Sequence, residues 1–211
     1  MKPMLFNMEM VKAILEGRKT CTRRLVKGIP SSASCTFRCM DYVTFTWKEK
    51  MQNADILLDK QAEVPAPYRP GDVLYVRETW TALHYVDANG RTHYDQEMYF
   101  YAADGEPDVT LYDADGFEQD DQRIRWRPSI HMPKEAARIF LRVKSVHPER
   151  LQSITRNGAI SEGCNAAVPI VEFSVLWDST VKLAAREHCG WAANPWVWVI
   201  EFERIEEGEA K

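Results

Sequence analysis

A short basic segment, EGRKTCTRR at 16–24, places side chains that could do chemistry close together. Lys19 and Thr22 lie three residues apart, and Arg18 and Arg23 stand beside them. A threonine hydroxyl becomes a nucleophile when a neighbouring base accepts its proton, and a lysine can be that base if desolvation or nearby cations make it neutral. The segment therefore predicts a nucleophile and a base among guiding arginines.

A plainer interpretation of the same residues also stands. Lys19 can be a phosphate contact, Thr22 an ordinary strand residue, and Glu162, far along the chain, a salt-bridge partner. Residues three apart in an extended chain point to opposite faces, so a Lys19–Thr22 pair requires a turn or bulge after Gly17. The residues alone leave both interpretations open.

The basic segment follows a predicted short helix. Asn7 can cap this helix, and Gly17 suits a left-handed stop at its end. Apolar side chains recur between them at helical spacing, at Met10, Val11, Ile14 and Leu15. From Thr20 onward the β-branched sequence TCTRRLV predicts a strand, so the candidate residues lie where a helix gives way to a strand.

Three later segments alternate as strands do. The first is PYRPGDVLYVRETW, in which a Pro-Gly turn precedes the strand, the second lies at 137–146, and the third is PWVWVIEFERI. The side chains expected to share a face are Leu74, Val76, Glu78 and Trp80 in the first strand, and Trp196, Trp198, Ile200 and Phe202 in the third.

Two helices are expected between the second and third of these strands. The first, within 151–163, has Thr155 as its cap and Glu162 in its last turn before Gly163. The second, at 169–182, begins at a proline and carries an apolar stripe. Four tryptophans on periodic apolar faces are expected in the core, namely Trp177, Trp191, Trp196 and Trp198.

Two stretches interrupt this pattern. Residues 28–67 show no sustained period, apart from a hairpin expected around 37–47, and 84–122 contain an Asn-Gly pair typical of a tight hairpin turn. Strands interrupted by short helices, with no βαβ alternation and no repeat, indicate an α+β fold with a small curved or barrel-like sheet. We expect one domain, 1–211, with these two insertions.

The charges are unevenly spread, although the chain as a whole carries −4. Residues 1–27 hold seven Lys and Arg against two Glu, and 123–150 hold eight against two. Between these basic blocks, 104–121 carries eight carboxylates and no cation. If the two basic blocks meet in space, they form a positive surface suited to a polyanion; otherwise each is a solvated face.

Composition narrows the class of protein. The chain is 45% hydrophobic and 27% charged, as soluble globular proteins are, and it lacks a signal peptide and an apolar run of ~20 residues, which predicts a cytoplasmic location. Five irregularly spaced cysteines predict thiols rather than disulfides. Neither a metal nor another cofactor is expected, because Cys35, Cys39, His188 and Cys189 lack zinc-module spacing and no phosphate-binding glycine loop, serine elbow or HExxH helix occurs.

Five segments in order resemble the ASCH domain family, whose fold is similar to that of PUA RNA-binding domains. They are GRKTCTRR, PGDVLYVRETW, AISEGC, the Trp-bearing helix and NPWVWVIEFERI. WRPSIHMPKEAARI and the long insertions resemble the larger ASCH proteins carried by phages and prophages. The resemblance leaves 28–67 and 84–122 uncovered. It implies a PUA-like curved β-barrel with short helices flanking a cleft.

The resemblance also implies an activity. Some small members of the family hydrolyse N4-acylated cytidine through a lysine, a threonine and a glutamate, without a metal. The lysine and threonine of the family's G-x-K-T-x-T pattern fall on Lys19 and Thr22, and the glutamate of its A-x-x-EG pattern falls on Glu162. Glu162 would then pass a proton to the leaving amine. Those small amidohydrolases lack both insertions.

Ligand contacts are expected in a basic cleft around these three residues. RNA or a modified cytidine nucleoside is the expected ligand, because tryptophans stack on bases and arginines pair with phosphate or carbonyl oxygens. The predicted contacts are Arg18, Arg23, Arg77, Glu78, Trp80, Trp126, Arg127 and Ser129. The alternatives are a noncatalytic RNA-binding module, a ribonuclease using Thr22, Ser129 or His131, and a phage protein that binds a host factor through its acidic insertion.

Overall fold

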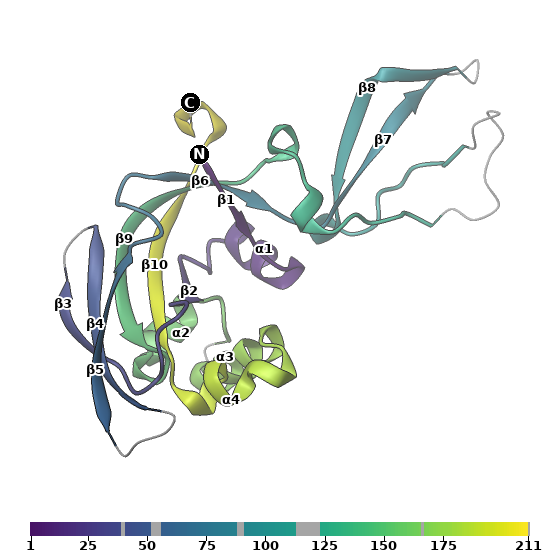
Figure 1. The fold of residues 1–211 in the computed structure, drawn as a ribbon. Helices are drawn as coiled ribbons and strands as arrows, with labels where there is room; N and C mark the ends of the chain where they lie inside the picture. Colours follow the sequence, from purple (N-terminus) through teal and green to yellow (C-terminus); the bar gives the residue numbers. More distant parts are fainter. Residues whose placement is uncertain (39–40, 52–55, 88–90, 113–122, 166, 211) are drawn as a thin grey trace.

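The computed structural model describes residues 1–38, 41–51, 56–87, 91–112, 123–165 and 167–210 of the chain. Within these residues the fold is mixed α+β, as the sequence predicts, with three sheets and four α-helices. The largest sheet forms the body of the molecule, and the two smaller sheets extend from it (Figure 1). No helix of the described residues has the length and hydropathy that a membrane span requires.

The central sheet has five strands in the order β1-β6-β9-β10-β2. β1 and β6 are parallel, and the other neighbours are antiparallel. The long strands β9 and β10 curve together along the body (Figure 1). The bounds are Lys2–Leu5 for β1, Cys21–Leu25 for β2, Val73–Arg77 for β6, Phe140–Arg150 for β9 and Trp196–Ile205 for β10.

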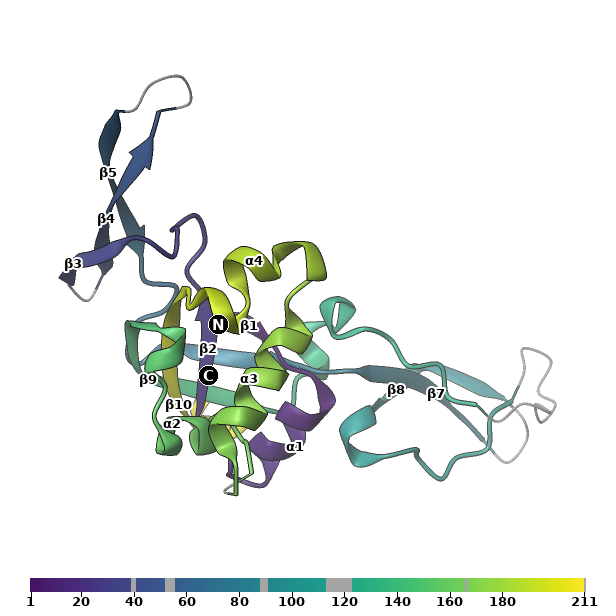
Figure 2. The same cartoon turned by 90° about the horizontal axis from the view of Figure 1, so that it is seen from below.

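Helices cover both faces of this sheet. On one face, the predicted stripe of β10 packs with Val11 and Ile14 of α1. On the other face, Val197 and Val199 of β10 pack with Phe173 of α3. Figure 2 shows α3 lying across the strands. The helices are α1 (Met8–Leu15), α2 (Arg156–Ser161), α3 (Pro169–Thr180) and α4 (Arg186–Cys189). The faces predicted for the last strand are therefore confirmed.

The predicted helix ends are confirmed as well. The Asn7 side chain accepts a hydrogen bond from the Met10 N–H at 2.9 Å, and the Thr155 hydroxyl accepts one from the Gly158 N–H at 3.0 Å. Gly17 adopts a left-handed φ of +74° after α1. Short 3₁₀ turns connect the main elements, at Ala102–Asp104, Ser129–His131, Lys134–Ala136, Leu151–Ser153, Leu183–Ala185, Trp191–Ala193 and Glu207–Ala210.

The strand predicted to run through Trp80 ends earlier than the sequence indicates. β6 stops at Arg77, and Trp80 begins a separate strand, β7 (Trp80–Val86). Glu78 lies at the break, where its N–H donates to the Met132 sulfur at 3.2 Å and its side chain turns inward. Every second residue from Leu74 to Trp80 is buried, on both sides of the break. The sequence therefore has the pattern of one continuous strand.

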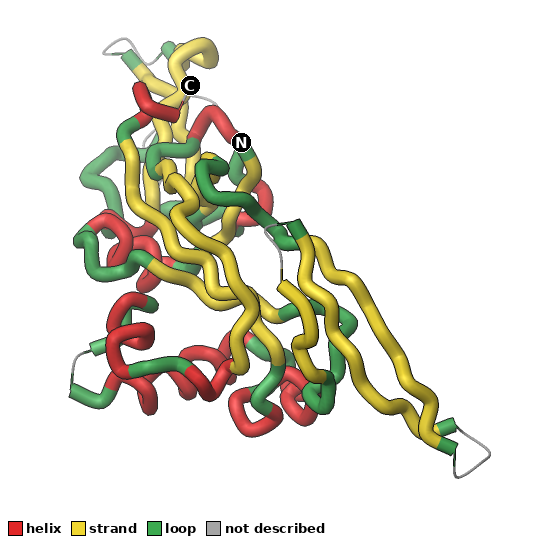
Figure 3. The backbone as a smooth tube through the Cα atoms, turned by 90° about the vertical axis from the view of Figure 1, so that its left-hand side faces the viewer, coloured by secondary structure: helices red, strands yellow, loops and turns green. Residues whose placement is uncertain are grey.

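The first insertion forms a three-stranded sheet of β3 (Ser34–Arg38), β4 (Tyr42–Lys50) and β5 (Leu57–Pro65). β3 and β4 are the hairpin expected around 37–47, while the third strand was not predicted. Figure 3 looks onto this sheet. It joins the main core through Phe45, whose ring packs edge-on against Trp196 with centroids 5.2 Å apart.

The second insertion is built on a two-stranded arm, β7 and β8 (Thr92–Tyr101), which projects from the body away from the first insertion (Figure 2). The arm begins at Trp80, four residues before the insertion predicted at 84–122. The strands pair up to Val86 and Thr92, and the expected Asn-Gly turn between them lies outside the described residues. Half of the acidic stretch 104–121, from 113 to 121, also lies outside them.

Candidate active site at the start of β2

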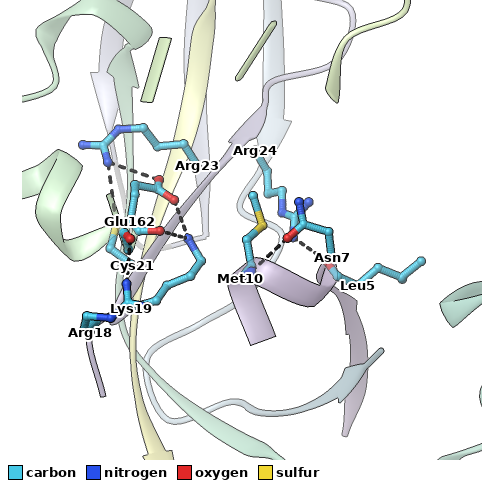
Figure 4. Close-up of polar contacts among 10 residues, drawn as sticks. Leu5, Asn7, Met10, Arg18, Lys19, Cys21, Arg23, Arg24 and Glu162 are labelled. Atoms are coloured by element: carbon cyan, nitrogen blue, oxygen red, sulfur yellow. Dashed lines mark hydrogen bonds and ion pairs between the residues drawn. The ribbon is translucent and has the colours of Figure 1, made fainter. Parts of the chain in front are cut away.

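Lys19 and Glu162 form a buried ion pair, although 143 positions separate them in the chain. The Lys19 ammonium donates to Glu162 Oε2 at 2.6 Å and to the Glu162 backbone carbonyl at 2.9 Å. The exposed fractions of the two side chains are 0% and 3%. Figure 4 shows both side chains pointing toward each other. Two of the three residues assigned to catalysis therefore meet.

The ends of α1 and α2 hold this pair in place. The Lys19 N–H donates to the Ala13 carbonyl at 2.9 Å, and the Thr20 N–H donates to the Ser161 carbonyl at 2.9 Å. Gly163 follows Glu162 with φ +97°, and a Cβ there would lie 3.0 Å from the Ala13 Cβ. Only glycine suits that conformation and that space, so α2 can end directly against α1.

Arg23 extends the ion pair into a chain of four charges. Its Nη1 donates to Glu162 Oε1 at 3.3 Å, and its Nη2 donates to Glu149 Oε1 at 3.1 Å (Figure 4). Lys19, Glu162, Arg23 and Glu149 thus alternate in sign and sum to zero. Buried groups stay charged when each is paired and hydrogen-bonded. Glu162 meets this condition, because each of its carboxylate oxygens accepts a hydrogen bond from a cation.

Thr22 lies on the opposite face of β2 from Arg23. It pairs with Ile200 of β10, whereas Arg23 pairs with Val199. Thr22 is 2% exposed, and its hydroxyl makes no hydrogen bond within the described part of the chain. Its predicted contact with Lys19 is therefore absent among those residues, and the Lys19 ammonium donates to Glu162 instead.

Phe6 marks the side of β2 on which Lys19 and Thr22 lie. The Lys19 ammonium is 5.7 Å from the centroid of the Phe6 ring, and the Arg24 guanidinium is 5.3 Å from it. Thr22 shares a strand face with Arg24 because side chains alternate along β2. The turn that the sequence requires before Thr22 lies at Gly17, which has φ +74°, and Lys19 and Thr20 connect it to β2.

Two neighbours of the pair have other roles. Burial, and the nearby Glu162 carboxylate, raise the pKa of the Cys21 thiol to about 12, so Cys21 is not a nucleophile at neutral pH. Arg18 lies at the surface, where its Nε donates to Glu16 at 2.6 Å and its Nη1 to the Gly163 carbonyl at 2.9 Å. Arg18 thus lies at the surface beside Glu162, and its contact with a ligand stays a prediction.

The structure places six predicted ligand contacts elsewhere, around the base of the β7–β8 arm. Glu78 is 1% exposed and accepts two hydrogen bonds from Arg138, each at 3.0 Å. The pKa of Glu78 is raised above its usual value, because the effect of burial exceeds that of the hydrogen bonds from Arg138, which lower it. Arg138 also donates to Asp104 at 2.6 Å. Glu78 thus anchors the arm from inside. Its carboxylate is buried and paired with Arg138, so it is not exposed to the ligand that the sequence predicts for it.

The other five residues of this group surround the same anchor. Arg127 stacks 5.0 Å from the Trp80 ring, and the two residues exchange backbone hydrogen bonds. Arg77 donates to the Ile130 carbonyl at 3.2 Å, next to Ser129, and Trp126 is half-buried. Among described residues, no hydrogen bond or ion pair joins the side chains of this group to Lys19, Thr22 or Glu162. The single cleft expected from the sequence therefore stays a prediction.

Comparison of the chain with protein-family models, curated proteins and solved structures gives no match. The functional argument therefore depends on the geometry of the site. That geometry includes Glu149, which the sequence did not single out because it lies 126 positions from Arg23 inside a basic block.

Proposed function

We propose that the protein hydrolyses the amide bond of N4-acylated cytidine, as a nucleoside or within RNA. The observation that carries this proposal is the buried Lys19–Glu162 contact of 2.6 Å, which joins two of the three residues that the ASCH resemblance assigns to the reaction. The curved central sheet with helices on both faces also fits the PUA-like barrel of that family.

The ion pair can supply both a base and an acid. When the proton in the 2.6 Å hydrogen bond moves from Lys19 to Glu162, a neutral amine and a neutral carboxylic acid result. Burial favours this neutral pair because it carries no charge in a medium of low dielectric. Arg23 opposes this transfer, because its hydrogen bond to the same carboxylate is stronger when the carboxylate is charged.

Each proton in the reaction then has a donor and an acceptor. The Thr22 oxygen attacks the acyl carbonyl, its proton passes to the neutral Lys19 amine, and the Glu162 acid protonates the departing N4 of cytidine. Cytidine leaves, the acyl group stays on Thr22, and the ion pair returns to its charged form. Water then hydrolyses the ester with Lys19 and Glu162 in the same two roles.

A groove reaches Glu162 of the buried pair, whereas Lys19 and Thr22 are not among its lining residues. It opens between α1, α2 and α3 with a volume of about 950 Å³, and Glu162 and Arg18 line it. Its other walls are largely apolar, with Met10 and Leu176 among them. Sites for small molecules commonly have this size and character, so the groove can admit a nucleoside with its acyl group.

The test is release of cytidine from N4-acetylcytidine, followed by chromatography. We expect turnover by the native protein and by Lys12→Met, which changes an exposed lysine of α1. Lys19→Met should abolish turnover while circular dichroism shows a folded protein. If Lys19→Met does not fold, Thr22→Val replaces it, because that change removes no charge. Equal turnover by the native protein and a folded Lys19→Met would contradict the proposal.

A noncatalytic RNA-binding module is the second candidate. The observation that favours it is that the Lys19 ammonium makes two hydrogen bonds to Glu162, whereas none joins it to Thr22 among the described residues. Lys19 cannot serve it as a phosphate contact, because its side chain is 0% exposed. Under this function labelled RNA binds without turnover of N4-acetylcytidine, and Arg18→Ala reduces the salt dependence of binding whereas Lys19→Met does not.

A further inference from the structure

The strand β5 lies at one edge of the three-stranded sheet. It pairs with β4 along all nine of its residues, from Pro65 opposite Tyr42 to Leu57 opposite Lys50, and no other described strand pairs with it. Figure 3 shows the strands of this sheet extending beyond the body of the molecule. Because a strand at a sheet edge presents backbone groups that can bond to a further chain, the edge of β5 offers a place for an added strand.

The hydrogen bonds at the two ends of the β4–β5 pairing identify the free backbone groups. The Met51 N–H donates to the Ile56 carbonyl at 3.0 Å, and the Ala66 N–H donates to the Asp41 carbonyl at 2.9 Å. Hydrogen-bonded pairs alternate with non-bonded pairs in an antiparallel ladder, and the register runs without a shift along the two strands. The even-numbered residues of β5 therefore bond to β4. The backbone groups of the odd-numbered residues point away from β4 and form what we call the outer edge, namely Leu57, Asp59, Gln61 and Glu63.

The opposite edge of this sheet is less suited to an added strand. β3 has five residues, and its register with β4 shifts between Cys35 and Phe37. Such a bulge disrupts the ladder and twists the edge away from a partner. The outer edge of β5 is longer and regular, so it is the edge of this sheet that suits a further strand.

Apolar side chains are exposed where the outer edge begins. Leu57 and Leu58 are exposed on opposite faces of β5, and the preceding Ile56 is exposed as well. On the face of Leu58 the strand runs toward Val64, which packs against the main core. An added strand with apolar side chains on this face would bury Leu58 and continue that packing.

The charges of the outer edge favour a basic partner. Asp59 and Glu63 lie four residues apart and therefore point to the same face. Asp59 has an exposed ion pair with Lys48 at 3.7 Å, whereas Glu63 lies opposite Thr44 and makes no ion pair within the described residues. Opposite charges directly across two strands stabilise their pairing, and like charges destabilise it. A strand with cations facing Asp59 and Glu63 thus fits this edge, and an acidic strand does not.

A second copy of the chain fits the outer edge poorly. Antiparallel pairing of two β5 strands about a twofold axis at Asp59, Lys60 or Gln61 would place like charges opposite each other. The opposed groups would be Asp59 and its copy, Lys60 and its copy, or Asp59 and the copy of Glu63. An axis farther toward either end of the strand overlaps fewer of the outward N–H groups.

We infer that the outer edge of β5 binds an extended basic segment of another protein, which adds to the sheet as a fourth strand. One face of this segment carries two cations four residues apart, which pair with Asp59 and Glu63, and the other face carries apolar side chains that cover Leu58. The backbone hydrogen bonds supply affinity, and the charges supply specificity. The inference is independent of hydrolysis, because no residue of β5 lines the groove that reaches Glu162.

The experiment is fluorescence anisotropy of a labelled nine-residue peptide titrated with the full chain. The peptide alternates threonine and valine, and lysine replaces threonine at its third and seventh positions. A matched control peptide carries glutamate at these two positions. We expect the lysine peptide to bind, and the glutamate peptide to bind roughly tenfold more weakly, because two favourable cross-strand pairs become repulsive.

Two substitutions separate the effect of the backbone from that of the charge. Gln61→Pro removes an outward N–H but no bond to β4, so it should weaken binding of the lysine peptide roughly tenfold while circular dichroism shows a folded protein. Gln61→Thr keeps this N–H and should bind as the native protein does. Glu63→Lys should weaken binding of the lysine peptide roughly threefold and strengthen binding of the glutamate peptide.

The inference is overturned if the native protein does not bind the lysine peptide, if it binds both peptides equally, or if a folded Gln61→Pro binds as the native protein does. If Gln61→Pro does not fold, Glu63→Lys decides, because it changes an exposed side chain, and an unchanged preference between the two peptides would contradict the inference. Sedimentation velocity adds a further check. Self-association of the native protein that Glu63→Lys alters would identify a second copy as the partner and overturn the inference.

Discussion

Lys19 Nζ lies 2.6 Å from Glu162 Oε2, and this contact links the start of β2 to the end of α2. Each residue follows the helix that positions it, α1 for Lys19 and α2 for Glu162. Since the pair is buried, it affects the stability of the fold as well as any chemistry at the site. The two effects can be measured separately.

The first prediction concerns the stability that depends on this pair. Lys19→Met leaves a buried carboxylate with Arg23 as its remaining partner and should lower the free energy of unfolding by roughly 3–5 kcal/mol. Lys12→Met, which breaks an exposed pair with Glu9, should change it by less than about 0.5 kcal/mol. Urea denaturation measures both. If both variants lost the same free energy of unfolding, the buried Lys19–Glu162 pair would contribute no more stability than the exposed Lys12–Glu9 pair, and the prediction would be wrong.

The second prediction tests the close approach of α1 and α2. Gly163 and Gly105 both have φ +97°, but a Cβ at Gly105 meets nothing within 4 Å, whereas one at Gly163 meets the Ala13 Cβ at 3.0 Å. Gly105→Ala should cost about 1–2 kcal/mol from backbone strain, and Gly163→Ala about 1–3 kcal/mol more from overpacking. Equal shifts in the denaturation midpoints would show that the helix ends have room to separate.

The third prediction concerns the two carboxylates that hold Arg138. Glu78 is buried, whereas the side chain of Asp104 is 52% exposed. Glu78→Gln should therefore destabilise the protein by roughly 3 kcal/mol, and Asp104→Asn by less than about 1 kcal/mol. Thermal or urea unfolding of the two variants provides the comparison. A larger loss for Asp104→Asn would contradict the role of Glu78 as the anchor of the arm.

The fourth prediction concerns alkaline pH. Burial raises the pKa of the Cys21 thiol from 9.0 to about 12, so the folded state keeps a proton that the unfolded state loses above pH 9.0. Stability should therefore fall as the pH rises from about 9 toward 12, with a contribution from Cys21 of at most about 1.4 kcal/mol per pH unit. In Cys21→Ala this contribution disappears. Unfolding curves at several alkaline pH values test it, and identical slopes for both proteins would refute it.

Local chemistry in the sequence predicts much of the fold around the site. Asn7 and Thr155 cap their helices as their residue types indicate, and Gly17 ends α1 in the left-handed conformation. The alternation in β10 gives its two buried faces correctly. These features depend on residues close together in the chain, which is why sequence patterns record them.

Pairings between distant residues could not be predicted in the same way. The basic block at 123–150 suits a polyanion only if it forms a positive surface with 1–27, but Arg138 is engaged by Glu78 and Asp104, and Arg142 by Glu203 and Glu209. Arg150 donates to backbone carbonyls, among them that of Ala33 at 2.7 Å. Their partners come from segments far along the chain, so a count of charge along the sequence overstates the free positive surface.

The point where the chain leaves the central sheet could not be predicted for a similar reason. Arg77 is the last residue of β6, and the chain leaves that sheet at Glu78 to build the arm. Nothing in the alternation of 73–80 marks this departure, because the buried positions continue through Trp80. Only the distant Arg138 marks the break, because its half-buried guanidinium pairs with the buried Glu78 carboxylate.

The central claim is that Thr22 attacks the acyl group of N4-acylated cytidine. Its most direct test is release of cytidine from N4-acetylcytidine by the native protein, by Thr22→Val and by Thr81→Val, which alters another buried threonine. The account predicts turnover by the native protein and by Thr81→Val, and none by a folded Thr22→Val. Turnover by Thr22→Val at the native rate, or no turnover by the native protein, would contradict it.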